Sequence, residues 1–199
     1  LSDSRRREEI FLAAAIGELV DKHIKKHGRR FDNFSEFNSI QLNDTHPILA
    51  IAEFIRLLTT EHRVCLSDAL EVAKKTFSYT NHTILPEALE CWQSLQIKKI
   101  LPEIYSILMK VYVKQKDEFA RLKCSPEEAS DMAIYSADKF SMANLALFVG
   151  NKVNGVAKLH TDILKSNLFK TAFKYYPEKF QNKTNGITQR RWLMLCTVL

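Results

Sequence analysis

Residues 78–92 read Ser-Tyr-Thr-Asn-His-Thr-Ile-Leu-Pro-Glu-Ala-Leu-Glu-Cys-Trp, and this stretch decides the fold that we expect. Aromatic and β-branched residues at 77–80 indicate a short strand. Three hydrogen-bonding side chains follow it, at residues 81–83. Pro86 suits the first turn of a helix, because its missing N–H has no helical partner there. A strand, a polar turn and a helix in this order predict the ligand-binding edge of an α/β sheet.

Two other segments indicate further strands of the same sheet. Residues 39–43 end in polar residues and lead to Pro47, which suits the start of another helix. Residues 143–149 are almost continuously apolar, as expected for a strand that is buried on both faces. Because helical segments separate these strands, we expect an α/β fold with a parallel, Rossmann-like sheet and helices on both faces.

Apolar periodicity predicts helices around these strands. Gly28 closes the first helix as a C-cap. Ser125 and Glu128 form the pattern of a capping box. We expect helices over residues 5–27, from 47, over 67–75, 86–95 and 102–123, from 125, and over 155–166 and 168–176.

The composition is that of a globular protein. The 199 residues are 46% hydrophobic and 26% charged, and the low content of five Gly and five Pro argues against a low-complexity chain. The net charge of +6 would fit an anionic partner, but the densest basic run, residues 22–30, is typical of a solvated helix end. We therefore expect no nucleic-acid partner. No apolar run could span a bilayer, so we expect no membrane partner. The first residue is not Met, and we expect a piece of a longer protein.

The cysteines lie far apart in the sequence, without a Cys-x-x-Cys pair, so neither a zinc knuckle nor a thioredoxin motif is supported. Sparse cysteines are typical of a reducing compartment, and we expect a cytoplasmic protein. A metal site needs converging His, Cys or carboxylate ligands, and we expect none here.

Polar side chains gather where the expected strands end, at residues 43–46, 81–83, 151–155 and 182–185. Asn, Asp, Thr and His provide hydrogen-bond donors and acceptors in fixed pairs, which suit a hydroxyl-rich ligand such as a sugar. The chain has neither a Gly-rich phosphate loop nor a Gly-x-Ser-x-Gly elbow. A Ser-His-Asp triad stays open as an alternative.

Four motifs resemble signatures of the α-glucan phosphorylases, the family of glycogen, starch and maltodextrin phosphorylases. They are QLNDTHP at 41–47, YTNHT at 79–83 with LPEALE at 85–90, MANL at 142–145 with VNGVA at 153–157, and FQNKTNGIT at 180–188 with RRWL at 190–193. The motifs follow the order that they have in the family and extend over nearly the whole chain.

The resemblance implies part of a two-domain glycosyltransferase fold, an enzyme that moves a terminal α-1,4-linked glucosyl unit to inorganic phosphate and gives glucose 1-phosphate. It also implies pyridoxal phosphate, held mainly by a C-terminal domain, and a homodimeric parent. Residues 1–184 would be the second half of the N-terminal catalytic domain, which contributes the glucose-binding half of the cleft. Residues 185–199 would be the domain junction and the start of the C-terminal domain. Without the cofactor lysine, we expect this chain alone to be inactive.

The same resemblance implies roles for individual residues. They are His82, Asn185 and Asp44 in the catalytic group, Thr83, Val156 and His46 in substrate binding, and Trp192 near the cofactor. The backbone carbonyl and the ring of His82 would face the transferred glucose, and Asn185 would hydrogen-bond it. A neutral carbonyl near the anomeric carbon can stabilise oxocarbenium charge. Without the resemblance, Asp44 would be a helix cap, and His82 and Trp192 would be core residues.

Some positions depart from the family pattern. Gln189 replaces a proline and Cys91 replaces an arginine, and an arginine pair that binds the activator AMP in the animal enzymes is matched by Asp21 and Lys22. The end of the chain, residues 196–199, also departs from the pattern. Asp21 and Lys22 argue against control by AMP. Gln189, together with Glu103 and Ile104 at positions where the family has Arg-His, favours one alternative, a degenerate homologue that only binds glucan or a partner.

A second alternative is a glycosidase that uses two carboxylates. Asp44 and Glu87 are the candidates for that pair. Both follow strands in polar turns, where most carboxylates cap helices.

Overall fold

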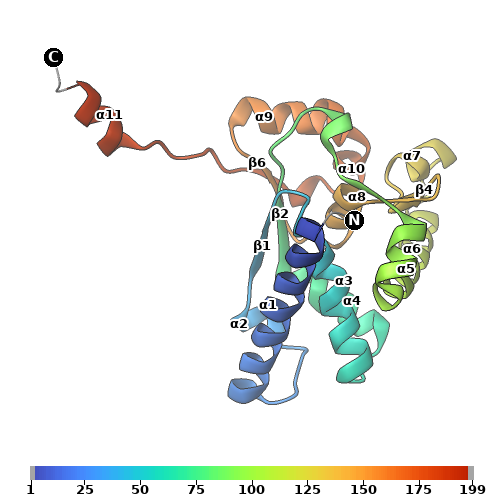
Figure 1. Ribbon diagram of the computed structural model, residues 1–199. Helices are drawn as coiled ribbons and strands as arrows, with labels where there is room; N and C mark the ends of the chain where they lie inside the picture. Colours follow the sequence, from blue (N-terminus) through green and yellow to red (C-terminus); the bar gives the residue numbers. More distant parts are fainter. Residues whose placement is uncertain (1–2, 197–199) are drawn as a thin grey trace.

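A parallel sheet forms the centre of the molecule, and helices flank it (Figure 1). The computed structural model describes residues 3–196. The four strands of the sheet are β1 (Ile40–Asn43), β2 (Phe77–Thr80), β6 (Val153–Gly155) and β7 (Phe180–Asn182). They lie side by side in this order, and every neighbouring pair is parallel. The predicted α/β fold with a parallel sheet is therefore confirmed.

The helices and the small second sheet follow the chain around this centre. The helices are α1 (Asp3–His27), α2 (Phe34–Phe37), α3 (Leu49–Arg56), α4 (Leu66–Thr76), α5 (Ser94–Ile100), α6 (Pro102–Leu122), α7 (Pro126–Asp131), α8 (Met142–Val149), α9 (Lys158–Ile163), α10 (Lys170–Tyr175) and α11 (Gln189–Cys196). The second sheet is antiparallel, in the order β3 (Cys91–Gln93), β5 (Lys139–Ser141) and β4 (Tyr135–Ser136).

The register of the main sheet aligns one buried side chain from each strand. Leu42 lies beside Tyr79, Tyr79 beside Val153, and Val153 beside Phe180. All four side chains are buried. Burying an apolar side chain of this size contributes about 1.5–3 kcal/mol, and a slip of one residue would turn the row to the opposite face. The register is thus specified by the core.

The strand predicted over residues 143–149 is wrong, because this segment forms α8. Its side chains are almost all buried, and an apolar run of this length does not distinguish a buried helix from a buried strand. The side chain of Ser141 accepts a hydrogen bond from the backbone N–H of Asn144 and caps the helix. The third strand of the parallel sheet is instead β6.

The helix predicted over residues 86–95 is also wrong. Pro86–Ala88 form a single 3₁₀ turn, and β3 follows before α5 begins at Ser94. The strand forms because residues 139–141, far along the chain, pair with it antiparallel. The helix predicted over 155–166 begins later, because Gly155 belongs to β6 and α9 starts at Lys158.

The remaining helix predictions agree with the structure. Gly28 has φ of 74° and donates its N–H to the carbonyl of Ile24, as a left-handed C-cap does. The helix expected over 67–75 is α4, and its N-cap position is Cys65. Ser125 and Glu128 form both hydrogen bonds of the predicted capping box.

The core lies between the main sheet and the helices α1, α3, α4, α6 and α8. Phe54 of α3 stands at its centre, with ring centroids 5.0 Å from Phe34 and 5.5 Å from Phe77. All three rings are fully buried. Aromatic pairs at such separations add about 0.5–1.5 kcal/mol beyond the area that they bury. This cluster holds α3 against β2.

Replacing Ser125 with Ala removes the side-chain oxygen that accepts from the Glu128 N–H at 3.2 Å. We expect the free energy of unfolding in urea to fall by about 1 kcal/mol, the usual cost of a lost N-cap. Ser130→Ala, at an exposed position of the same helix, is the matched control and should change little. Equal losses of unfolding free energy in both variants would contradict a stabilising role of Ser125 as the N-cap.

Glu128 predicts a pH dependence of stability. Hydrogen bonds from Lys174, Tyr175 and the Ser125 backbone lower the pKa of this carboxyl from 4.5 to about 2. Since the folded pKa lies below the unfolded one, the contribution is complete above about pH 4.5 and is lost as the pH falls towards 2. Glu128→Gln should therefore show a weaker loss of stability than the parent chain between pH 5 and 3 in urea titrations. If the free energies of unfolding of both proteins fell in parallel with pH, Glu128 would have no such role.

Candidate functional site

The carboxyl ends of the four parallel strands open onto one cleft with a volume of about 670 Å³. Parallel strands end at a common edge, where α/β proteins usually bind their ligands. The lining contains Gln41 and Asn43 from β1, Thr80 and His82 from β2 and its loop, Asn154 and Val156 from β6 and its loop, and Gln181 and residues 183–186 from β7 and beyond.

A row of neutral polar side chains crosses the floor of this cleft. The Gln41 amide donates to the Thr80 hydroxyl at 2.8 Å. That hydroxyl donates in turn to the side-chain oxygen of Asn154 at 3.0 Å. The row joins β1, β2 and β6, so the strand order itself brings these groups together. Gln41, Thr80 and Asn154 were not among the predicted site residues, and the alternation of Gln41 and Asn43 along β1 is a sequence signal that could have indicated a shared face.

The loop after β2 places His82 at the cleft. The ring nitrogen Nε2 of His82 is hydrogen-bonded to the side-chain oxygen of Asn43. An amide oxygen only accepts, so Nε2 carries the proton of this bond. The buried Asn81 donates to the Tyr79 hydroxyl at 3.0 Å and accepts from the Thr83 N–H at 3.1 Å. The Asn81 side chain thereby links the Tyr79 hydroxyl to the backbone N–H of the residue after His82, and burial raises the pKa of Tyr79.

The segment after β7 brings Asn185 to Val156. The N–H of Lys183 donates to the Gly155 carbonyl at 3.1 Å, and the N–H of Asn185 donates to the Val156 carbonyl at 2.9 Å. These bonds continue the pairing of β6 with β7 beyond the strands. The structure therefore places His82, Val156 and Asn185 in one lining.

The other predicted site residues lie outside that lining. Asp44 has φ of 76°, and its carboxylate accepts from the Thr45 N–H at 2.7 Å. The Thr83 hydroxyl accepts from the Leu85 N–H at 3.0 Å. His46 is exposed in the turn before α3. Trp192 is 57% exposed on α11, which Figure 1 shows apart from the body of the molecule.

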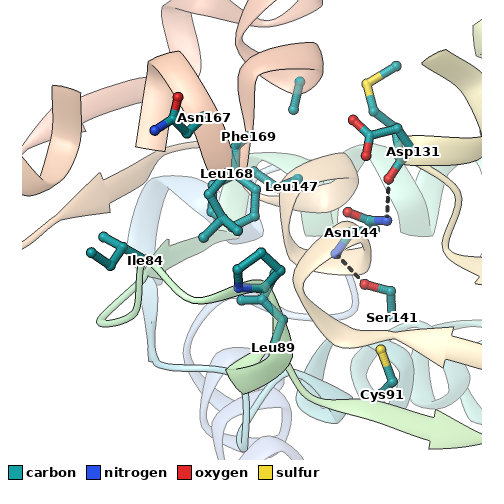
Figure 2. A pocket seen from close by; sticks show the side chains of 13 residues that line it. Ile84, Leu89, Cys91, Asp131, Ser141, Asn144, Leu147, Asn167, Leu168 and Phe169 are labelled. Carbon is teal, nitrogen blue, oxygen red and sulfur yellow. Dashed lines mark hydrogen bonds between the residues drawn. The ribbon is translucent and has the colours of Figure 1, made fainter. Parts of the chain in front are cut away.

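A second hollow, of about 570 Å³, lies between the segment at residues 84–91 and helices α8 and α10. Figure 2 shows apolar side chains there, including Leu89, Leu168 and Phe169. The Asn144 side chain donates to the carbonyls of Asp131 and Ala133. Most residues that line this hollow are apolar, whereas most residues that line the strand-end cleft are polar, so the strand-end cleft is the better candidate for a polar ligand.

His23 and His27 stand four residues apart on α1, a spacing that metal sites also use. One ring nitrogen of His23 is bonded to the Arg30 carbonyl at 2.8 Å, and the other to the Asn38 amide at 3.1 Å. His23 therefore fastens the segment after α1. Among the side chains that the structure describes, at residues 10–196, no three of His, Cys, Asp or Glu form a group that could hold a metal. None of the helices in that range has the length and apolar character needed to cross a membrane.

Comparison with known proteins decides the family. The model of the carbohydrate phosphorylase family matches residues 5–198. The chain belongs to this family. The resemblance that the motifs predicted is thereby confirmed at the level of the family.

Several glycogen phosphorylases are similar to this phosphorylase chain. The human liver form is 41% identical over 211 aligned positions, the human brain form 40% over 206, and glycogen phosphorylase 2 of Dictyostelium discoideum 38% over 192. The alignments cover 94–96% of this chain but only 19–24% of those relatives. The chain thus spans about a quarter of the length of the relatives that it matches.

Gly155, between the lining residues Asn154 and Val156, packs closely against α9. A Cβ there would lie 2.6 Å from the Thr161 hydroxyl and 3.0 Å from the Thr161 Cα, so α9 would have to move. We expect Gly155→Ala to lower the free energy of unfolding by about 1–3 kcal/mol, the usual range for overpacking.

Gly17→Ala is the control for the Gly155 variant, because no atom lies within 4 Å of a Cβ at that helical position. It should be neutral or stabilise the protein by up to about 1 kcal/mol. Urea unfolding measures both variants, and a Gly155→Ala protein as stable as the parent would refute the close approach.

Proposed function

We propose that this chain is the glucose-binding part of a glucan phosphorylase. The enzyme transfers a terminal α-1,4-linked glucosyl unit to inorganic phosphate and releases glucose 1-phosphate. The observation that carries the proposal is the strand-end cleft, in which His82, Val156 and Asn185 meet beside neutral amides and a hydroxyl. Membership of the carbohydrate phosphorylase family supports it.

The chemistry of the lining fits a sugar. Amides and hydroxyls both donate and accept, as sugar hydroxyls do. Among the described residues of the lining, only Lys183 carries a full charge. Inorganic phosphate is bound by several cations or by backbone N–H groups at a helix terminus. We therefore assign the glucosyl unit to this cleft and most of the phosphate binding to other parts of the protein.

In the proposed reaction, the C1–O bond of the terminal glucosyl unit breaks and a C1–O bond to phosphate forms. The oxygen that leaves with the shortened glucan takes the proton that the hydrogen phosphate ion loses. Positive charge develops at C1, and the His82 carbonyl is the group that we propose to stabilise it. Asn185 would grip a sugar hydroxyl from the opposite side of the cleft. The bond between His82 and Asn43 fixes the imidazole ring.

Pyridoxal phosphate is the cofactor that the family implies, and when it is bound its phosphate assists the transfer. The described residues do not form a site for it by themselves, because the expected contact, Trp192, lies exposed on α11 and outside the cleft. We therefore derive no step through the cofactor. We propose that its lysine and most of its contacts belong to the part of the relatives that this chain does not span, and that this chain alone is inactive.

For the parent protein we propose the organisation that the family implies. Residues 1–184 would belong to the N-terminal catalytic domain, and residues 185–199 to the junction and the start of the next domain. An extended segment leaves the body after β7 and leads to α11, which supports this boundary (Figure 1). Residues 197–199 of that interval lie outside the described residues. We also propose that the parent protein is a cytoplasmic homodimer.

The glycosidase alternative has little support in the geometry. The Asp44 carboxylate is bound to the N–H of Thr45, and neither Asp44 nor Glu87 contributes to the lining of the cleft. A pair of catalytic carboxylates should flank the scissile bond. A homologue that binds glucan without turning it over is the alternative that the next experiment separates.

His82→Ala and Asn185→Ala in the full-length protein should each lower turnover by about 10²–10³, the scale for a lost transition-state donor. Glucan affinity should fall much less, because these groups act most strongly as charge develops at C1. The assay is phosphate-dependent release of glucose 1-phosphate, beside glucan affinity and melting temperature.

Asn151→Ala is the matched control for these two variants. It removes an exposed amide at the opposite end of β6, and it should leave turnover unchanged. Near-normal turnover of folded His82→Ala and Asn185→Ala would show that the site is assigned to the wrong residues. Glucan binding by a parent protein that releases no glucose 1-phosphate would favour the non-catalytic alternative, and glucan cleavage without phosphate would favour a glycosidase.

A further inference from the structure

His160 lies on α9 behind the cleft, and its ring bridges two strand-end loops. Its Nδ1 accepts from the backbone N–H of Val156 at 3.0 Å. Its Nε2 is 3.2 Å from the backbone carbonyl oxygen of Thr83. Val156 follows β6, and Thr83 follows His82 in the loop after β2. The ring therefore joins segments that are more than seventy residues apart in the chain.

The two partners determine the state of the ring. A backbone N–H can only donate, so Nδ1 must be without a proton. A carbonyl can only accept, so Nε2 must carry one. His160 is thus a neutral imidazole with its proton on Nε2, and it needs both nitrogens for the bridge. The side chain of no other natural residue combines a rigid ring with an acceptor and a donor in these positions.

The bridge is part of a longer chain of hydrogen bonds. The carbonyl of Val156 accepts from the N–H of Asn185 at 2.9 Å. These bonds link the Thr83 carbonyl, through the His160 ring and the backbone of Val156, to Asn185. The carbonyl in the same peptide group as the Val156 N–H is that of Gly155, and it accepts from the N–H of Lys183 at 3.1 Å, so the bonds from Lys183 to Thr83 form a series that polarises cooperatively. The contacts of Val156 therefore connect the loop that carries His82 with the segment that carries Asn185.

The surroundings hold His160 in place. A Cβ on Gly155 would lie 2.9 Å from Nδ1, so the absence of a side chain there lets the ring approach. The neighbouring Thr161 donates to the Ala157 carbonyl and contacts the Asn182 amide oxygen at 3.1 Å, which anchors α9 to β7. On the other side, Asn81 already holds the Thr83 N–H. The bridge thus joins two parts that are themselves rigid.

We propose that His160 is a positioning residue, which sets the separation of the His82 loop from Asn185 through its bonds to Thr83 and Val156. The proposal rests on the function proposed above, because it concerns the two residues assigned there to the glucosyl unit. His160 itself does not line the described cleft, so it acts through these neighbours. A displacement of about 1 Å in a catalytic group can cost about 10² in rate.

Two conservative variants each keep one of the two hydrogen bonds that the His160 ring forms. The oxygen of Asn can occupy the place of Nδ1, so His160→Asn keeps the acceptor for Val156. The amide nitrogen of Gln can occupy the place of Nε2, so His160→Gln keeps the donor for Thr83. His160→Ala removes both. Leu159→Ala, at a position of α9 that is 73% exposed, is the control for changes in the helix itself.

Two measurements are made on the full-length protein and its variants. The first is turnover and Michaelis constant for glucan in phosphate-dependent glucose 1-phosphate release. We expect His160→Ala to lower turnover by about 10–10², with a small change in the Michaelis constant, and the Asn and Gln variants to fall between Ala and the parent. Leu159→Ala should match the parent, and melting temperature reports whether each variant is folded.

The second readout is deuterium exchange of the backbone amides, which does not depend on activity. Exchange at Val156 should become faster in His160→Ala and His160→Gln but not in His160→Asn. Unchanged exchange in all three variants would refute the bridge. Faster exchange with unchanged turnover would refute its positioning role. A parent protein without phosphorylase activity would refute the proposed function, while the exchange pattern would still decide the bridge.

Discussion

The pairing of β2 with β1 on one side and β6 on the other is the constraint on which the rest of the structure depends. Its hydrogen bonds continue past the strand ends, from the Asp44 N–H to the Thr80 carbonyl and from the Asn81 N–H to the Asn154 carbonyl. Backbone groups buried in a sheet must be paired, so these bonds leave the loops little freedom. Because the four strands of the main sheet run in the same direction, the loops after β1, β2, β6 and β7 emerge at the same edge, whereas Asn151 and Lys152 precede β6 and lie at its opposite end.

A contact with helix α8 holds the opposite, amino-terminal edge of the main sheet. The Lys179 ammonium donates to the carbonyls of Leu147 and Phe148 at 2.9 Å each, at the carboxyl end of α8. Burial lowers the pKa of Lys179 to about 8. A cation at the end of a helix satisfies carbonyls that have no helical partner. Since Lys179 immediately precedes β7, this contact ties the last strand to the central helix.

Both side chains and backbone hydrogen bonds form the cleft. Neutral side chains from β1, β2 and β6 present a surface suited to hydroxyl groups, and the backbone bonds between residues 183–185 and β6 bring Asn185 to it. The position of each group is specified by a neighbour, as for His82 by Asn43. Such preorganisation lets a neutral site act on developing charge without large rearrangement. Under the proposed function, the strong negative charge of phosphate would be met mainly by other parts of the protein.

The sequence by itself determined the family, the parallel α/β class, two of the four strands, most of the helix positions and the capping of α1 and α7. These depend on local chemistry: strand and turn propensities, Gly28 in a left-handed conformation and Ser125 at a helix start. Only the tertiary structure decided that 143–149 is a helix and that 91–93 is a strand, because burial on all sides and distant pairing partners decide those states. It also decided which motif residues share one lining. Val156 and Asn185 meet through backbone bonds between β6 and the segment after β7, and no pattern in one segment encodes that contact.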